Sequence, residues 1–176
     1  FWTAVVSVGI VIVSIITYWP AEKSTGFSET LIIDPMSILL KLVLLISLLF
    51  NFFYAREYFN RSAKGQSEFY ILTIFSALGM MVLISAQSLL TLYLGLELLS
   101  LSLYAMVAME RDSALASEAA MKYFILGALA SGMLLYGISM LYGVSGTLNL
   151  AELAEYSVKG DQSLLLVFGL VFVLVG

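Results

Sequence analysis

Long apolar runs separated by short polar segments make up most of the chain. A helix needs about 20 apolar residues to cross the ~30 Å hydrocarbon core of a bilayer, so each long run is predicted to span a membrane. The pattern predicts five full spans, at residues 1–19, 36–54, 69–85, 89–108 and within 117–142. A sixth run begins near Leu164 and, as a helix, would reach only about 20 Å before Gly176. We therefore expect the chain to be an internal fragment of a longer membrane protein.

Helices fit these runs better than strands do. Open strands would leave backbone N–H and C=O groups without partners in lipid, and the runs lack the alternation of a membrane β-barrel. Asp34-Pro35 is a typical helix start, and residues 86–88 predict a tight hairpin between two spans. A short surface helix is expected after Asn149. The predicted fold class is an all-α, polytopic bundle of transmembrane helices.

Basic residues in the connecting segments predict how the bundle is oriented. Cytoplasmic loops of membrane proteins carry an excess of Lys and Arg. One side of the predicted bundle carries four such residues, Arg56, Arg61, Lys64 and Arg111, whereas the other side carries Lys23 and Lys159. We therefore expect the side with four basic residues to face the cytoplasm.

Composition narrows the functional classes. Apolar residues make up 61% of the 176 residues and charged residues 11%, whereas soluble domains have about 25% charged residues. The formal net charge of −4 argues against a nucleic-acid-binding surface. Because the chain has neither Cys nor His, it offers no thiolate metal site, iron–sulfur cluster, haem-ligating imidazole or Ser-His catalytic pair. We expect no catalytic residue, metal site or cofactor in this chain.

Three ionisable residues, Lys41, Glu97 and Lys122, fall inside predicted spans. A charge at mid-bilayer costs from about 2.5 to more than 10 kcal/mol, depending on the method, and usually faces a bundle interior or a water path. Each is therefore a candidate functional residue. Lys41 lies near the start of its span, where its side chain can extend to the surface or meet Asp34 or Asn51. We favour that structural interpretation for Lys41.

Glu97 is the strongest candidate because it lies near the middle of its span. A carboxyl group among apolar side chains favours its neutral form unless a cation lies near, and this property suits a proton carrier. Tyr93, Ser100 and Tyr104 extend a polar stripe along the same predicted helix face. The alternative is a protonated Glu97 that a neighbouring hydroxyl holds and that serves only helix packing.

Lys122 has more than one candidate partner. Its predicted depth is close to that of Glu97, and the two spans are consecutive and antiparallel, so an ion pair between them is geometrically reasonable. Glu118 lies one turn earlier on the same helix, in the favourable Glu-before-Lys order. The lysine could also extend to the membrane surface.

Small residues between Gly127 and Gly132 are spaced for close helix packing.

Two stretches resemble a known family. EFYILTIFSALGMMVLISAQSLLTLYLGLELLSLSLYAMVA and SALASEAAMKYFILGALASGMLLYGISMLYGVSGTLNL are similar to the subunit N family of NADH:quinone oxidoreductase, respiratory complex I. They are more distantly similar to Mrp-type cation/proton antiporter subunits. The similarity covers residues 68–150, and its specific marks are Gly95-x-Glu97-Leu98 and Glu118-Ala-x-x-Lys122-Tyr123.

The resemblance implies a proton-translocating membrane-arm subunit, in which quinone reduction elsewhere drives proton transfer. It implies an antiporter-like fold with inverted repeats. Residues 1–176 would be a single membrane domain, and 68–176 would be the start of the first repeat. Proton translocation is assigned to Glu97 and Lys122. Accessory roles fall to a second set, Glu118, Lys41, Tyr104 and Ser100.

The same resemblance implies that NADH and quinone act elsewhere in the complex. The implied partners are other complex I membrane subunits, the lipid bilayer and protons, with no nucleic acid. The implied location is a bacterial inner membrane, in a multi-pass arrangement. In the implied mechanism, a Glu97–Lys122 ion pair forms in one state and an arriving proton breaks it. The alternatives are an Mrp-type sodium/proton antiporter subunit and a membrane scaffold whose charges have no transport role.

Overall fold

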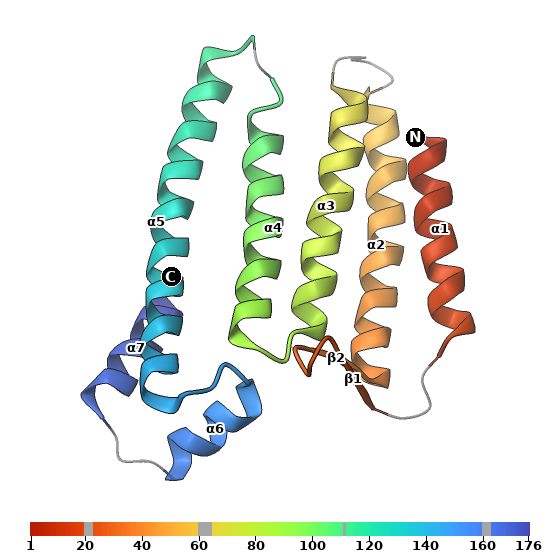
Figure 1. The fold of residues 1–176 in the computed structure, drawn as a ribbon. Helices are drawn as coiled ribbons and strands as arrows, with labels where there is room; N and C mark the ends of the chain where they lie inside the picture. Colours follow the sequence, from red (N-terminus) through yellow and green to blue (C-terminus); the bar gives the residue numbers. More distant parts are fainter. Residues whose placement is uncertain (20–22, 60–64, 111, 160–162) are drawn as a thin grey trace.

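A computed structural model describes residues 1–19, 23–59, 65–110, 112–159 and 163–176. Helices form most of these ranges (Figure 1). In chain order they are α1 (Trp2–Thr17), α2 (Pro35–Phe59), α3 (Gln66–Ser85), α4 (Leu89–Val107), α5 (Ala114–Ser145), α6 (Leu150–Lys159) and α7 (Leu164–Val175). Two short strands, β1 (Ser24–Gly26) and β2 (Leu31–Ile33), lie between α1 and α2.

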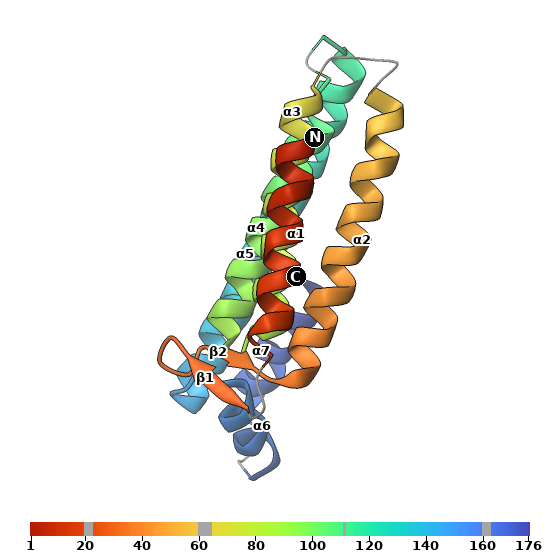
Figure 2. The same ribbon diagram turned by 90° about the vertical axis from the view of Figure 1, so that its right-hand side faces the viewer.

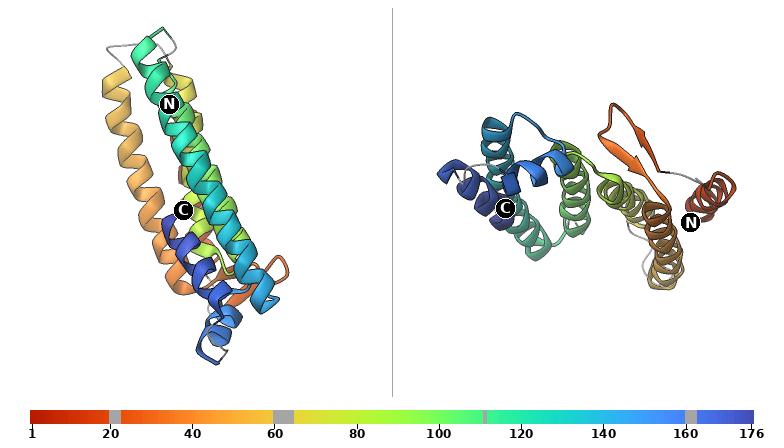
Figure 3. Two further views of the ribbon diagram at one scale, coloured as in Figure 1. Left: turned by 90° about the vertical axis from the view of Figure 1, so that its left-hand side faces the viewer. Right: turned by 90° about the horizontal axis from the view of Figure 1, so that it is seen from below.

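The long helices stand side by side in chain order, and each runs antiparallel to the next (Figure 1). Seen from below, α1 to α5 form a row (Figure 3). α7 packs against α5, at the end of the row opposite α1. From the α1 end of the row, α6 lies below the long helices (Figure 2). Short connections give this order, because antiparallel helices that follow one another in the chain tend to be neighbours.

Within the described ranges, four helices are long and apolar enough to cross a membrane, namely α2, α3, α4 and α5. They coincide with four of the predicted spans. α1 and α7 are apolar but have only 16 and 12 residues, so the count of five full spans and a sixth stays a prediction. The tight hairpin at residues 86–88 is confirmed, because α3 ends at Ser85 and α4 begins at Leu89. α6 is the predicted surface helix.

A small β-hairpin is the main departure from the all-α prediction. β1 pairs antiparallel with β2, and Ser24 lies opposite Ile33. The turn between the strands holds Phe27, Ser28 and Glu29 at positive φ, a conformation that residues other than glycine rarely adopt. Strands of three residues are too short to show the apolar–polar alternation by which a strand is recognised in a sequence.

The hairpin and the segment before α6 both dock on the turn between α3 and α4. The backbone N of Gln87 donates to Thr30 O (2.9 Å), and the backbone N of Leu150 donates to Gln87 O (3.0 Å). The backbone N of Leu89 donates to Leu148 O (2.9 Å). Hydrogen bonds of the main chain therefore join three segments that are distant in sequence at one end of the bundle.

Buried side chains form two separate clusters. One cluster joins α1, α2 and α3 and includes the fully buried Phe52. The other joins α4, α5, α6 and α7 and includes Leu141, which is 1% exposed. The contact between α3 and α4 links the two clusters.

Two glycines, Gly79 and Gly95, form that contact between α3 and α4. A Cβ added at Gly79 would lie 2.7 Å from the backbone N of Leu99 and 2.8 Å from the backbone O of Gly95. The obstructing atoms belong to the main chain, so they cannot rotate away. Glycine therefore lets the two backbones touch, which is a common basis of helix association in lipid.

Replacing Gly79 by alanine should destabilise the protein by about 1–3 kcal/mol, the usual range for overpacking. The measurement is the melting temperature of the purified full-length protein in detergent. At Gly9 on α1 an added Cβ would have nothing within 4 Å, so Gly9→Ala is the control and should not lower the melting temperature. Equal melting temperatures for the Gly79→Ala variant and the parent would contradict the contact.

The predicted helix cap at Asp34 is confirmed. Its Oδ1 accepts a hydrogen bond from the backbone N of Ser37 (2.8 Å), and Ser37 Oγ accepts one from the backbone N of Asp34 (3.1 Å). Hydrogen bonding with Ser37, through its side chain first and its backbone second, lowers the pKa of the Asp34 carboxyl below its ordinary value. The ionised carboxylate therefore stabilises the start of α2.

This lowered pKa gives the cap a pH dependence. The carboxylate contributes fully above the ordinary pKa of Asp, and its contribution is lost as the pH falls through the lowered value. Hydrogen exchange of the amides in the first turn of α2, corrected for intrinsic rates, should therefore accelerate at acid pH. In Asp34→Asn the uncharged amide keeps its acceptor oxygen at every pH, so this acceleration should be absent. An identical acceleration in both proteins would contradict the role of the carboxylate.

Candidate functional site

Glu97 lies at the interface between α4 and α5. Its Oε2 accepts a hydrogen bond of 2.7 Å from Ser131 Oγ on α5. Ser131 Oγ also lies 3.1 Å from the hydroxyl of Tyr93 on α4. All three residues are half-buried. We call these three residues, Tyr93, Ser131 and Glu97, the hydroxyl–carboxylate chain.

The sequence places these groups by helical spacing. Tyr93 and Glu97 are four residues apart, so they share one face of α4, as the predicted polar stripe requires. Tyr104 lies further along α4, and its ring packs edge-to-face against Tyr123 of α5 at 4.7 Å between ring centroids. Ser100 is half-buried on α4 and takes no part in the hydroxyl–carboxylate chain in the part of the molecule that the structure describes.

The small residues of α5 allow this close contact. A Cβ added at Gly127 would overlap the hydroxyl of Tyr104, and Ser131, one turn further on, reaches Glu97. The predicted close packing is therefore confirmed for Gly127 and Ser131. Gly132 and Ala128, two other small residues of the same stretch, are exposed, and an added Cβ at Gly132 has open space around it.

Lys122 pairs with Glu118 and not with Glu97. Its Nζ lies 2.5 Å from Glu118 Oε1, and the two side chains are 70% and 62% exposed within the described chain. Of the alternatives that the sequence left open, the structure adopts the local i,i+4 pair. The ion pair between Glu97 and Lys122, one of these alternatives, is not formed in this structure.

Helix geometry explains this correction. Lys122 and Ser131 are nine residues apart, which is about two and a half turns, so they point to opposite sides of α5. The side that carries Ser131 faces Glu97. Moreover, α5 extends beyond the end of α4 (Figure 1), so the two helices are offset along their axes. Equal distances counted from the connecting loop therefore do not correspond to equal depths.

The remaining candidates lie elsewhere. Lys41 is half-buried on α2, and α3 stands between α2 and α4 (Figure 1), so Lys41 does not join Glu97. Of the four basic residues that predict the orientation, only Arg56 belongs to the described residues, and its guanidinium lies 4.7 Å from the ring centroid of Phe1. Arg61, Lys64 and Arg111 lie outside the described residues, and the orientation stays a prediction.

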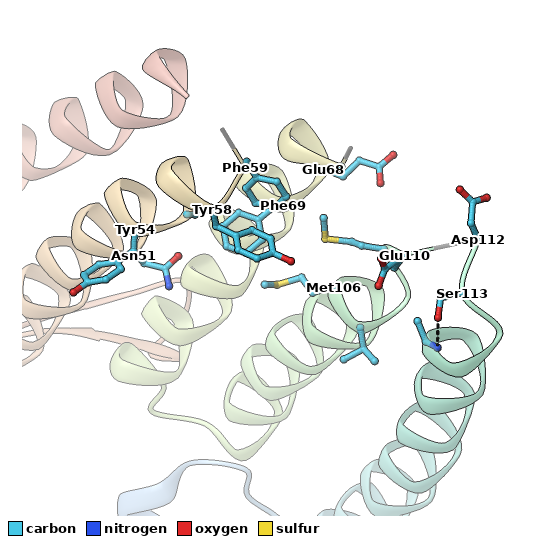
Figure 4. A pocket seen from close by; sticks show the side chains of 15 residues that line it. Asn51, Tyr54, Tyr58, Phe59, Glu68, Phe69, Met106, Glu110, Asp112 and Ser113 are labelled. Atoms are coloured by element: carbon cyan, nitrogen blue, oxygen red, sulfur yellow. Dashed lines mark hydrogen bonds between the residues drawn. The ribbon is translucent and has the colours of Figure 1, made fainter. Parts of the chain in front are cut away.

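A cavity of the described chain lies away from these residues. It has a volume of about 1040 Å³ and lies where α2 and α4 end and α3 and α5 begin (Figure 4). Its lining includes aromatic and acidic side chains, among them Tyr54, Tyr58, Phe69, Glu68 and Glu110. Neither Glu97 nor Lys122 lines it, so the cavity is a feature of the bundle end and not of the candidate site.

Ser131 is the residue that sequence reasoning missed. In the sequence, Ser131 belongs only to the small residues spaced for close helix packing, because a serine on an apolar helix indicates no function until its neighbour is known.

No group of three or more Cys, His, Asp or Glu residues within the described ranges is placed to hold a metal ion.

The hydroxyl–carboxylate chain and the Glu118–Lys122 pair lie in the part of the chain that a family model matches. The family is described as NADH:quinone oxidoreductase/Mrp antiporter, transmembrane, and its model matches residues 86–176. This range is more than half of the sequence. The chain belongs to this family. The residues that match the NADH:quinone oxidoreductase/Mrp antiporter model include all of α4, α5, α6 and α7.

Individual relatives agree with the family assignment. NADH-quinone oxidoreductase subunit N from Thioalkalivibrio sulfidiphilus is 52% identical over 171 residues, which cover 96% of this chain and 35% of the relative. The chain thus spans about a third of the length of this relative. The resemblance to subunit N is confirmed, and so is the predicted multi-pass location in a bacterial inner membrane.

Solved structures share the fold. A chain of respiratory complex I from Thermus thermophilus with bound aureothin is 31% identical, with a TM-score of 0.74, over 98% of this chain and 36% of that chain. A chain of the Mrp complex from Dietzia sp. is 18% identical, with a TM-score of 0.71, over 98% of this chain and 34% of that chain. At that identity the second likeness shows the fold alone.

Proposed function

We propose that the chain is part of a proton-translocating membrane-arm subunit of NADH:quinone oxidoreductase, and that it moves protons through Glu97 and Lys122. The observation that carries this proposal is the position of Glu97, an ionisable group that accepts a hydrogen bond at the interface between two apolar helices. Placing a carboxyl group at such a position costs free energy, so its presence there indicates a function. Relatives about 50% identical that are named subunit N support the same function.

The proposed charge coupling differs from a direct ion pair between Glu97 and Lys122. Glu97 and Lys122 act as two separate charge sites, since each has its own partner. Ser131, the residue of α5 that contacts Glu97, marks the level of Glu97 along α5. It is nine residues from Lys122, a rise of about 13 Å. Unit charges at that distance interact by about 1 kcal/mol at an effective dielectric constant of 20, against about 4 kcal/mol at 4 Å. The coupling is therefore modest and acts through space.

The accessory roles follow from the contacts. Glu118 holds Lys122, and Tyr104 packs between α4 and α5. Ser100 and Lys41 remain accessory candidates by sequence alone. NADH and quinone act elsewhere in the complex, and the chain holds no cofactor of its own. Its partners are other membrane subunits of complex I and the lipid bilayer.

The domain organisation belongs to the same proposal. Residues 1–176 form one membrane domain, and 68–176 are the start of the first antiporter-like repeat. α1 crosses the membrane together with the four longer helices, and α7 is the beginning of a sixth span. An Mrp-type sodium/proton antiporter subunit is the second candidate, and its support is the description of the matched family, which names the Mrp antiporter.

The test uses the full-length subunit in the assembled complex in membrane vesicles. NADH:quinone turnover and proton uptake are followed together for the parent and for Glu97→Gln. Loss of proton uptake per quinone reduced would support the proposal. Unchanged uptake and turnover would leave Glu97 as a packing residue and favour the membrane-scaffold alternative. Normal NADH:quinone turnover in a strain without the subunit would favour a separate antiporter.

A further inference from the structure

The hydroxyl–carboxylate chain links two helices through three oxygen atoms. Ser131 supplies the central oxygen from α5, whereas Tyr93 and Glu97 both belong to α4. Ser131 Oγ donates its one proton to Glu97 Oε2, so the Tyr93 hydroxyl must donate to Ser131 Oγ. In the observed arrangement, both hydrogen bonds therefore point toward the carboxylate.

The same three oxygen atoms also suit a protonated Glu97. An ionised carboxylate only accepts hydrogen bonds, whereas a protonated carboxyl group can donate one. When Glu97 takes up a proton, its new O–H can donate to Ser131 Oγ. The Ser131 hydroxyl then rotates and donates to the Tyr93 oxygen. Both protonation states thus keep two hydrogen bonds without a movement of either helix.

A lysine partner would act differently. An ammonium group donates hydrogen bonds and cannot accept them, so it favours the ionised carboxylate. In this structure Lys122 is on the other side of α5, paired with Glu118. The partner that Glu97 does have can serve both of its protonation states.

We propose that Ser131 is a positioning residue for proton transfer, which reverses its hydrogen bond with Glu97 as this carboxyl group gains and loses a proton. Tyr93 is the outer member of the hydroxyl–carboxylate chain, and its oxygen accepts the hydrogen bond that Ser131 donates after the reversal. This inference rests on the proposed function, because it presumes that Glu97 changes its protonation during turnover. It adds a residue of α5 to the transport machinery and explains how Glu97 keeps its hydrogen bond to Ser131 in both protonation states.

The test compares Ser131→Ala with Ser131→Thr in the full-length subunit within the assembled complex. The alanine variant removes the central hydroxyl, and the threonine variant keeps it. Ser102→Ala is the matched control, because Ser102 on α4 is 5% exposed and its hydroxyl donates only to Leu98 O (2.7 Å) of its own helix. Proton uptake per quinone reduced is the first measurement.

The infrared carbonyl band of protonated Glu97 is the second measurement, and its loss in Glu97→Gln assigns it. In Ser131→Ala this band should move to higher frequency, as for a carboxyl group without its hydrogen-bond partner. Proton uptake should fall by about tenfold, the change that corresponds to losing one hydrogen bond to a charged group. Ser131→Thr should restore both values, and Ser102→Ala should resemble the parent.

The outcomes separate this inference from the proposed function. If Glu97→Gln loses proton uptake while Ser131→Ala keeps both the parent band and the parent uptake, the positioning role is wrong and the proposed function stands. If Glu97→Gln itself pumps normally, both are wrong. If the complex with Ser131→Ala fails to assemble, Tyr93→Phe tests the hydroxyl–carboxylate chain by removing its outer hydroxyl. It should shift the band in the same direction by a smaller amount, and an unshifted band would overturn the proposal.

Discussion

The rate of proton uptake should fall by roughly a hundredfold when Glu97 is replaced by glutamine, since removing a group that takes part in proton transfer commonly costs about 10²–10⁴ in rate. Glutamine keeps the size of the side chain and can still accept a hydrogen bond from Ser131 Oγ, so the contact between α4 and α5 should survive. What the variant loses is the ability to bind and release a proton. Vesicles that contain the assembled complex, with a pH-sensitive dye, provide the measurement.

The control for this experiment is a second glutamate away from the helix interface. Glu152 is exposed on α6, where it accepts a hydrogen bond from Thr147. Glu152→Gln makes the same chemical change and should leave proton uptake at the parent level. Equal losses in both variants would mean that uptake responds to any removed carboxylate, and the assignment to Glu97 would fail.

Replacing Lys122 by methionine is the second change with a large expected effect. Methionine keeps an unbranched apolar side chain but removes the charge, so the electrostatic influence of Lys122 on the rest of the pathway disappears. We expect proton uptake to fall by about tenfold, the factor that corresponds to 1.4 kcal/mol. The complex should still assemble, because the Glu118–Lys122 pair is largely exposed and exposed i,i+4 pairs contribute only about 0.3–0.5 kcal/mol.

Glu118→Gln separates a transport role of Lys122 from a local one. If Lys122 serves only its ion pair with Glu118, either partner can be removed with the same result. If Lys122 carries charge in the transport cycle, Lys122→Met reduces proton uptake much more than Glu118→Gln does. Equal and small losses in the two variants would exclude the transport role of Lys122.

Much of the fold could be predicted because it depends on local properties. A membrane span requires a run of apolar residues about as long as the bilayer is thick, and α2 to α5 were recognisable on that ground alone. The cap at Asp34 is equally local, since the carboxylate and the amide it binds are three residues apart. The β-hairpin was missed because its strands are short and its backbone hydrogen bonds to the α3–α4 turn join distant segments.

The site was predictable only in part, for the same reason. An ionisable residue in an apolar run is visible in the sequence, so Glu97 and Lys122 were identified as candidates. Their partners depend on how far α5 is shifted along α4 and how it is rotated about its own axis. A rotation of half a turn decides whether Lys122 or Ser131 faces Glu97, and no local pattern determines that angle.

The amino-acid sequence by itself determined that this is a membrane protein and that Glu97 is the carboxyl group to follow. Both conclusions rest on the energetic cost of placing polar groups in lipid, which each residue carries wherever it lies. Only the tertiary structure decided that Glu97 meets hydroxyl groups and that Lys122 meets Glu118. These contacts depend on the packing of whole helices, in which glycines such as Gly79 and Gly127 bring neighbouring surfaces together.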